Sequence, residues 1–147
     1  MICPACFREL TEIQVGTVKL DVCAAGCGGI WFDAFELKRV ESEFSDAGHL
    51  PVNVPRSPAV KVDFSLKRGC PRCDGIKLKR HFFSAKRQVE VDQCPNCGGY
   101  WLDAGELDKI HEEHTQSVAA ETINDAEISM ASIRFLYRQR LQERANQ

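Results

Sequence analysis

The chain lacks long apolar runs and a strong net charge, its opening residues lack the pattern of a secretory signal, and each absence argues against a class of protein. No stretch of its 147 residues approaches the eighteen or so apolar side chains of a membrane span, so we expect no membrane partner. The opening residues, MICPACFREL, have no basic segment followed by an apolar one, as a secretory signal would. A formal charge of −2 argues against coating nucleic acid through bulk charge. We therefore expect a cytoplasmic protein.

The chain also lacks the length for two domains stabilised by apolar cores, because an internal repeat divides it into short units. The block CGGIWFDAFEL, residues 27–37, recurs as CGGYWLDAGEL, residues 97–107, with eight of eleven positions identical. A unit of this size buries too little surface to be secure on apolar contacts alone and usually needs a metal, disulfides or a partner subunit. Eight cysteines are available, and paired cysteines in a cytosolic protein more often hold a metal than form disulfides.

The cysteines form short pairs, two in each copy of the repeat. The pairs are Cys3 with Cys6, Cys23 with Cys27, Cys70 with Cys73, and Cys94 with Cys97. Sixteen residues separate the two pairs of the first copy and twenty those of the second, which is the spacing of four-cysteine zinc sites. Zinc bound in this way supplies on the order of 10 kcal/mol of folding free energy. The spacing therefore predicts two structural Zn²⁺ ions per chain.

Two reservations bear on the zinc hypothesis. A Cys-x-x-Cys pair can instead be a redox dithiol, but that chemistry needs one exposed pair at a helix start within a βαβ unit, whereas here two pairs recur in each of two units. The pair Cys23 and Cys27 is one residue longer than its counterpart. This departure raises the question of whether the first site is weaker or distorted.

Apolar residues alternate between the cysteine pairs, which is the period of half-buried strands. They are Ile13, Val15, Val18, Leu20 and Val22 in the first copy, and Leu78, Phe82, Val89 and Val91 in the second. After each repeated block the apolar spacing becomes helical. We therefore expect each unit to contain a β-hairpin between its cysteine pairs and to close with a helix.

The repeated block has a structural explanation for each of its parts. Its two glycines follow the last cysteine, where the chain must turn around the metal. Asp33 and Asp103 each precede a glutamate by three residues, so a capping box is expected, with the aspartate accepting from a backbone amide and the glutamate bonding back to the cap amide. Trp31 and Trp101 are expected to pack between ribbon and following helix, the alternative being exposed aromatics that bind a partner.

The pattern CPxC, a hairpin, and then CxxCGGxWxDxxEL resembles the transcription factor IIB-type zinc-finger family of bacterial proteins, in two tandem copies. The resemblance implies a zinc ribbon in each copy. Its implied ligands are Cys3, Cys6, Cys23 and Cys27 in one site and Cys70, Cys73, Cys94 and Cys97 in the other. Most members of this family have no established activity, so the resemblance implies a fold and a metal more firmly than a function.

The predicted fold class is a small, metal-dominated α+β protein of tandem zinc ribbons. We expect a first ribbon and helix over 1–46, a linker over 47–66, a second ribbon and helix over 67–114, and a long amphipathic helix over 115–147. The apolar stripe of this last segment can cover the ribbons or pair with a second chain, so 115–147 is the candidate element of a homodimer.

Basic residues concentrate in the hairpin of the second copy, over 67–87, and give the chain a candidate nucleic-acid surface. Its candidate contacts are Lys77, Lys79, Arg80, Lys86 and Arg87. A basic face beside an aromatic is typical of single-strand binding grooves. The alternative is a solvated hairpin whose charges balance the acidic first ribbon or the zinc thiolates. His111-Glu-Glu-His114 has its histidines three apart rather than the four of a metalloprotease helix, and we interpret it as a polar helix end.

No Ser/His/Asp set, phosphate loop or open metal triad accompanies the cysteines, so we expect no enzyme. The leading hypothesis is a non-enzymatic zinc protein that acts as a protein-interaction adaptor with an unidentified protein partner. The alternative is a transcription-related nucleic-acid binder that uses residues 67–87.

Overall fold

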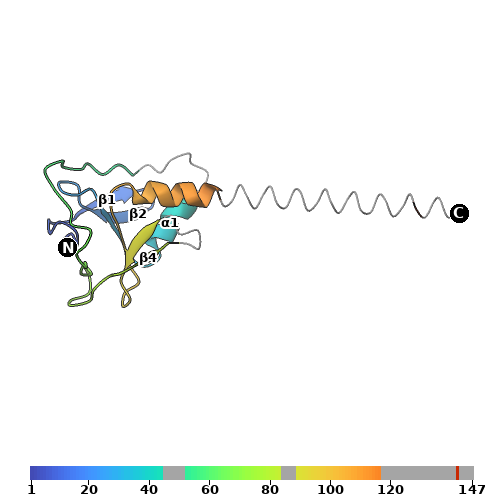
Figure 1. Ribbon diagram of the computed structural model, residues 1–147. Helices are drawn as coiled ribbons and strands as arrows, with labels where there is room; N and C mark the ends of the chain where they lie inside the picture. The colour runs from blue at the N-terminus through green and yellow to red at the C-terminus, as the bar shows by residue number, and fades with distance from the viewer. Residues whose placement is uncertain (45–51, 84–88, 117–141, 143–147) are drawn as a thin grey trace. The chain divides into compact units, whose positions relative to one another are not determined.

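The computed structural model describes residues 1–44, 52–83, 89–116 and 142 (Figure 1). The chain divides by its contacts into two units, 1–112 and 113–147, and the first holds both copies of the cysteine repeat. Of the helix predicted over 115–147, only 115, 116 and 142 are described, so that helix and the dimer contact assigned to it stay predictions. No helix among the described residues is long and apolar enough to cross a membrane.

The first copy of the repeat folds as its sequence predicts, as a hairpin, a short strand and a helix. β1 (Thr11–Val15) and β2 (Val18–Val22) pair antiparallel along their whole length. Gly16 turns the chain between them with a φ of 58°, which glycine adopts without strain. β3 (Ile30–Phe32) pairs with β2, and α1 (Glu36–Glu43) follows.

The second copy repeats this order with β4 (Lys79–Phe82), β5 (Glu90–Gln93) and β6 (Tyr100–Leu102), followed by a helical segment over 106–116. One predicted core position is wrong. Phe82 lies opposite Glu90 and is 42% exposed, while the next residue, Phe83, packs against the core. Phe82 shares its face of the strand with Leu78, which is buried in the tryptophan-side core, whereas Phe83 lies on the opposite face with Val89 and Val91.

The two ribbons join into one antiparallel sheet of six strands, in the order β1-β2-β3-β6-β5-β4. The junction is the pairing of β3 with β6, in which Trp31 lies opposite Trp101. The strand order and the repeat together relate the two ribbons by an approximate twofold axis through this pair. The linear repeat thus becomes an internal dimer of ribbons.

Each tryptophan packs against a glycine of the other ribbon. A Cβ atom placed on Gly29 would lie 2.2 Å from Cζ2 of Trp101, and one on Gly99 would lie 2.2 Å from Cζ2 of Trp31. Real Cβ atoms do not approach carbon this closely, so both positions require glycine. The second glycine of the repeated block therefore makes room for the indole of the opposite ribbon.

The two faces of the sheet carry different cores. Ile30 and Phe32 belong to the cluster that includes Leu37 and Val40 of α1, together with Leu107 and Ile110 of the second helix. Trp31 and Trp101 belong instead to a cluster with the cysteines, Leu10 and Leu78. The expectation that the tryptophans pack between ribbon and helix is wrong, because adjacent residues of a strand point to opposite faces.

Most of the predicted linker is an ordered strap, over residues 52–66, without helix or strand. The amide of Ser57 donates to the carbonyl of Gly26 over 2.9 Å. Val52 and Val54 pack on the helix side of the sheet, and Val60 and Val62 on the tryptophan side. The strap therefore contacts both cores of the six-stranded unit.

Candidate metal centres

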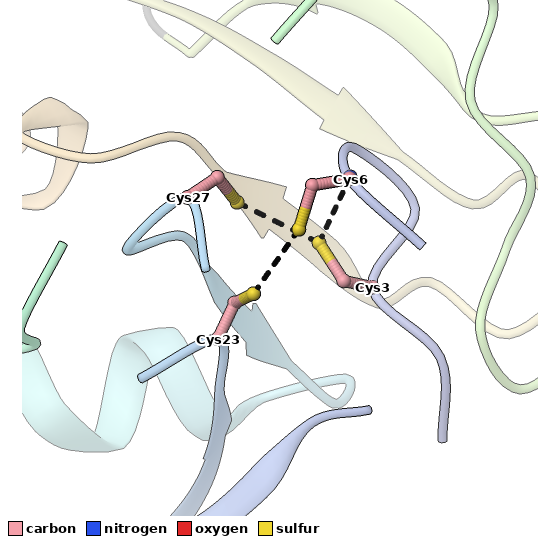
Figure 2. Close-up of side chains that lie close together, drawn as sticks. All are labelled: Cys3, Cys6, Cys23 and Cys27. Atoms are coloured by element: carbon pink, nitrogen blue, oxygen red, sulfur yellow. Dashed lines mark hydrogen bonds between the residues drawn. The ribbon is translucent and has the colours of Figure 1, made fainter. Parts of the chain in front are cut away.

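Two turns of the first ribbon bring four cysteine sulfurs together (Figure 2). Cys3 and Cys6 come from the N-terminal turn, and Cys23 and Cys27 from the loop between β2 and β3. All four Sγ atoms lie within 4.8 Å of one another, with 3.6 Å between Cys3 and Cys27 and 3.4 Å between Cys6 and Cys23. A tetrahedral shell with Zn–S bonds of about 2.3 Å has its sulfurs about 3.8 Å apart. The four free thiols therefore fit Zn²⁺.

The second ribbon builds the same arrangement from Cys70, Cys73, Cys94 and Cys97, whose Sγ atoms also lie within 4.8 Å of one another. The sulfurs of Cys70 and Cys97 are 3.8 Å apart. The side-chain amide of Asn96 donates to Sγ of Cys73 over 3.2 Å. Each of the two four-cysteine groups can hold one zinc ion.

Backbone amides point at the sulfurs in both sites. In the first, the amides of Ala5 and Cys6 each lie 3.4 Å from Sγ of Cys3. In the second, the amide of Cys73 lies 3.3 Å from Sγ of Cys70. An amide donor stabilises a thiolate more than a thiol, so these turns favour the charged form that binds metal.

The longer Cys23–Cys27 turn closes because one of its residues is glycine. A Cβ atom on Gly26 would lie 2.5 Å from Sγ of Cys23 and 2.9 Å from Sγ of Cys6. The turn thus fits its additional residue because the backbone of Gly26 packs directly against the two sulfurs. Sequence reasoning did not identify Gly26 as a site residue, although a glycine next to the last cysteine of an extended turn is a visible signal.

The thiols perturb one another strongly. The hydrogen bond with Cys3 lowers the pKa of Cys27 to about 6, and that same bond raises the pKa of Cys3. Burial and a hydrogen bond with Cys6 raise the pKa of Cys23 to about 11. Four thiolates cannot be crowded together without a compensating cation, and Zn²⁺ deprotonates the thiols that it coordinates. When zinc is bound it supplies this positive charge and a cross-link between the two turns of each ribbon.

Both sites are of the structural kind. Each has four sulfur donors, which fill a tetrahedral zinc shell and leave no position for water or a substrate. Cys3, Cys23, Cys27 and Cys94 are also buried. The geometry therefore suits a metal that holds the fold together.

The aspartates of the repeated block do something other than the predicted capping. The backbone amides of Asp33 and Asp103 make the expected contact, each donating to the glutamate three residues on over 2.7 Å. Their carboxylates accept from the indole N–H of Trp31 and Trp101, at 2.9 Å and 3.2 Å. Half of the capping box is therefore present, and the aspartate side chains orient the buried tryptophans instead of capping a helix.

An arginine of the second ribbon joins each of these aspartates. Arg72, from the turn that carries Cys70 and Cys73, binds the carboxylate of Asp33 in the first ribbon through two nitrogens. Arg68 is buried and donates to Asp103 at 2.7 Å and to Asp92 at 3.1 Å. The bond from Arg72 thus ties the second zinc turn to the first ribbon, which the sequence did not reveal because the partners are far apart along the chain.

The candidate nucleic-acid contacts differ in their surroundings in the structure. Lys77 and Lys79 are exposed. Arg80 binds Asp92 at 3.1 Å and the carbonyl of Phe64 at 2.8 Å, so its guanidinium serves the fold. Lys86 and Arg87 lie outside the described residues. Three arginines of the basic hairpin segment, Arg68, Arg72 and Arg80, therefore neutralise aspartates of this chain.

His111 differs from its expected place in a polar helix end, because it is buried, whereas His114 is exposed. The helix therefore turns His111 toward the protein interior and His114 toward solvent. Neither histidine belongs to a cluster of potential metal ligands among the described residues.

Comparison with known proteins agrees with this geometry. The sequence model of the transcription factor zinc-finger family matches residues 2–43 and 69–113, which together make up more than half of the chain. The two matched segments each contain one complete four-cysteine group. No curated protein and no solved structure matches the chain.

Proposed function

Because this chain belongs to the transcription factor zinc-finger family, with two tandem copies of its ribbon, we propose that it is a non-enzymatic zinc protein that acts as a protein-interaction adaptor. Both metal groups are closed by four sulfurs, so the zinc would be structural and no catalytic position would remain on it. The fusion of the ribbons into one sheet would give the adaptor a fixed surface.

The observation that carries this proposal is a pair of strained, exposed phenylalanines on the first ribbon. Phe7 and Phe35 have φ of 64° and 72° and are 73% and 78% exposed. In the second ribbon the left-handed residue of the first cysteine turn is Gly75, one position further along than Phe7, and the equivalent of Phe35 is Gly105, with φ of 71° and 86°. The left-handed conformation costs a non-glycine residue about 1–2 kcal/mol. Backbone strain at a residue whose aromatic ring is exposed to solvent is typical of functional positions, so it supports a docking role for these two rings.

Nucleic-acid binding is the second candidate, favoured by exposed Lys77 and Lys79 on the hairpin segment that ends in exposed Phe82. It is the weaker one because three neighbouring arginines already pair with aspartates. If Z phosphates of a single strand are engaged, log K should fall with log salt at a slope of about −0.7Z. Binding that is absent or independent of salt would remove this candidate.

The test is to recover the tagged full chain from its host with its associated molecules, with and without nuclease. The proposal expects a protein that stays bound after nuclease treatment and is depleted when Phe7→Gly and Phe35→Gly are combined. Leu66→Ala, which shortens an exposed apolar side chain elsewhere on the unit, is the matched control and should retain the partner. Loss of all associated protein on nuclease treatment would contradict the adaptor role.

A further inference from the structure

The approximate twofold axis creates two equivalent grooves, each between the last cysteine turn of one ribbon and the start of the other ribbon's helix. A Cβ atom on Gly28 would lie 3.4 Å from Cβ of Ala104, and one on the equivalent Gly98 would lie 3.6 Å from Cβ of Ala34. The walls of the two grooves are therefore built from corresponding residues at similar separations.

The chain's own strap fills the first groove. The same Cβ atom on Gly28 would lie 3.2 Å from Cβ of Arg56, and the amide of the next strap residue, Ser57, donates to the carbonyl of Gly26. Val52 and Val54 pack on the core beside it. An extended segment with the sequence Val-Asn-Val-Pro-Arg-Ser, residues 52–57, is thus a ligand that this kind of groove holds.

The second groove is open in the part of the chain that the structure describes. Among the described residues, Ala34 alone comes within 4 Å of a Cβ added to Gly98, and none of them takes the place that Arg56 has beside Gly28. The cavity measures about 840 Å³, and its lining includes Leu37, Lys38, Glu41, Phe83, Asn96 and Tyr100. Cys97 is correspondingly half-buried where Cys27 is buried. This volume and the mainly apolar lining are typical of binding sites.

We propose that the open groove binds an extended segment of a partner protein that resembles the strap but carries an acidic residue in place of its arginine. The expected backbone hydrogen bond follows from the equivalence of Gly26 and Asn96. In the first groove the Gly26 carbonyl accepts from the strap, and in the open groove the Asn96 carbonyl would accept from an amide of the bound peptide. The charge follows from the repeat, because Lys38 lines the open groove and the residue at the equivalent position of the other copy is Asp108. Since this inference rests on the proposed adaptor function, it specifies the chemistry of the adaptor's partner.

Phe35 supports the choice of this groove, because it belongs to the lining and is the strained, exposed residue at the start of α1. Its counterpart beside the filled groove is Gly105. The aromatic ring is therefore present only at the groove that lacks an occupant from the described part of this chain. A phenyl ring there adds apolar contact area for the valines or proline of a bound segment.

The test is an NMR titration of the zinc-loaded full chain with the synthetic peptide Val-Asn-Val-Pro-Glu-Ser. The inference expects shifts confined to residues of the open groove, such as Leu37 and Tyr100. It also expects the peptide with arginine in place of glutamate, residues 52–57 of this chain, to bind about fivefold more weakly. Lys38→Glu should reverse that preference, whereas Lys77→Glu, an exposed charge outside this lining, should leave it unchanged.

Three outcomes would overturn the inference: no shifts with either peptide, shifts away from the groove, or equal affinities that Lys38→Glu does not alter. Association of the full chain with itself, lost on Lys38→Glu, would also overturn it, since the occupant would then be a second copy. The adaptor role fails on a different result, which is loss of all bound protein after nuclease treatment. Partners that survive nuclease but are unaffected by Lys38→Glu would contradict the groove alone.

Discussion

Substituting the second glycine of one repeat with alanine should destabilise the contact between the two ribbons. In Gly29→Ala the new methyl group would begin 2.2 Å from Cζ2 of Trp101, and within 3 Å of two further atoms of the same indole. Carbon atoms prefer separations of about 3.5–4.0 Å, so ring and strand must separate by more than an ångström. Trp101 is fully buried, so the ring has little room to move. Overpacking of this kind costs about 1–3 kcal/mol, and we expect the upper part of that range.

Urea unfolding at constant excess zinc, followed by tryptophan fluorescence and circular dichroism, would give the free energy of unfolding of each variant. Trp101→Phe removes the atoms that the methyl group meets, so Gly29→Ala should cost less in that background. The coupling energy between the two substitutions should be about 1 kcal/mol or more. Trp31→Phe, in the same ribbon as Gly29, should show no such coupling with Gly29→Ala.

The controls separate this contact from a general intolerance of alanine at glycine positions. Gly69→Ala should be close to neutral, because no atom of the residues that the structure describes lies within 4 Å of the added methyl group. Additive effects of Gly29→Ala and Trp101→Phe would refute the packing across β3 and β6. Coupling of Gly29→Ala with Trp31→Phe instead of Trp101→Phe would also refute this packing.

Three further predictions concern the first zinc site, the strained aromatic and a buried acid. Gly26→Ala places a methyl group 2.5 Å from Sγ of Cys23, so zinc titration should show weaker binding at one of the two sites; two unchanged affinities would refute this. Phe35→Gly should raise the free energy of unfolding by about 1 kcal/mol by removing left-handed strain, and a loss of stability in thermal melts would contradict it. Burial raises the pKa of Glu106 from its ordinary 4.5 to about 7, so its contribution to stability is fully present below pH 4.5 and is lost as the pH rises through 7. Glu106→Gln should therefore gain stability relative to the wild type between about pH 5 and pH 8 at saturating zinc, and a constant difference would refute the shift.

The sequence predicted the features that depend on local spacing. Cysteine pairs, alternating strands and the helical stripe after each block are all set by neighbours within a few residues, and the structure has a four-cysteine group and a hairpin in each copy. The glutamates that bond back to Asp33 and Asp103 were found for the same reason. The zinc groups were predictable because a short turn can supply two ligands by itself.

The pairing of the two ribbons through β3 and β6 could not be predicted from local spacing. β3 spans only Ile30–Phe32, and three apolar residues do not specify which strand lies beside them or on which face each side chain points. The roles of Gly29 and Gly99 follow from an indole about seventy positions away. Arg72 looked like part of a basic surface because its partner, Asp33, belongs to the other ribbon. These roles depend on contacts between residues far apart in the sequence, which a local sequence pattern does not predict.

Native mass spectrometry of the reduced full chain would show whether two closed tetrathiolate sites hold this fold. We expect two zinc ions per chain, and one in Cys3→Ser, which removes a donor from the first site only. The second site should stay loaded in that variant because its four sulfurs come from the other ribbon. A wild-type chain that carries fewer than two zinc ions, or that keeps its folded state with zinc removed, would show that the metal does not hold the ribbons together.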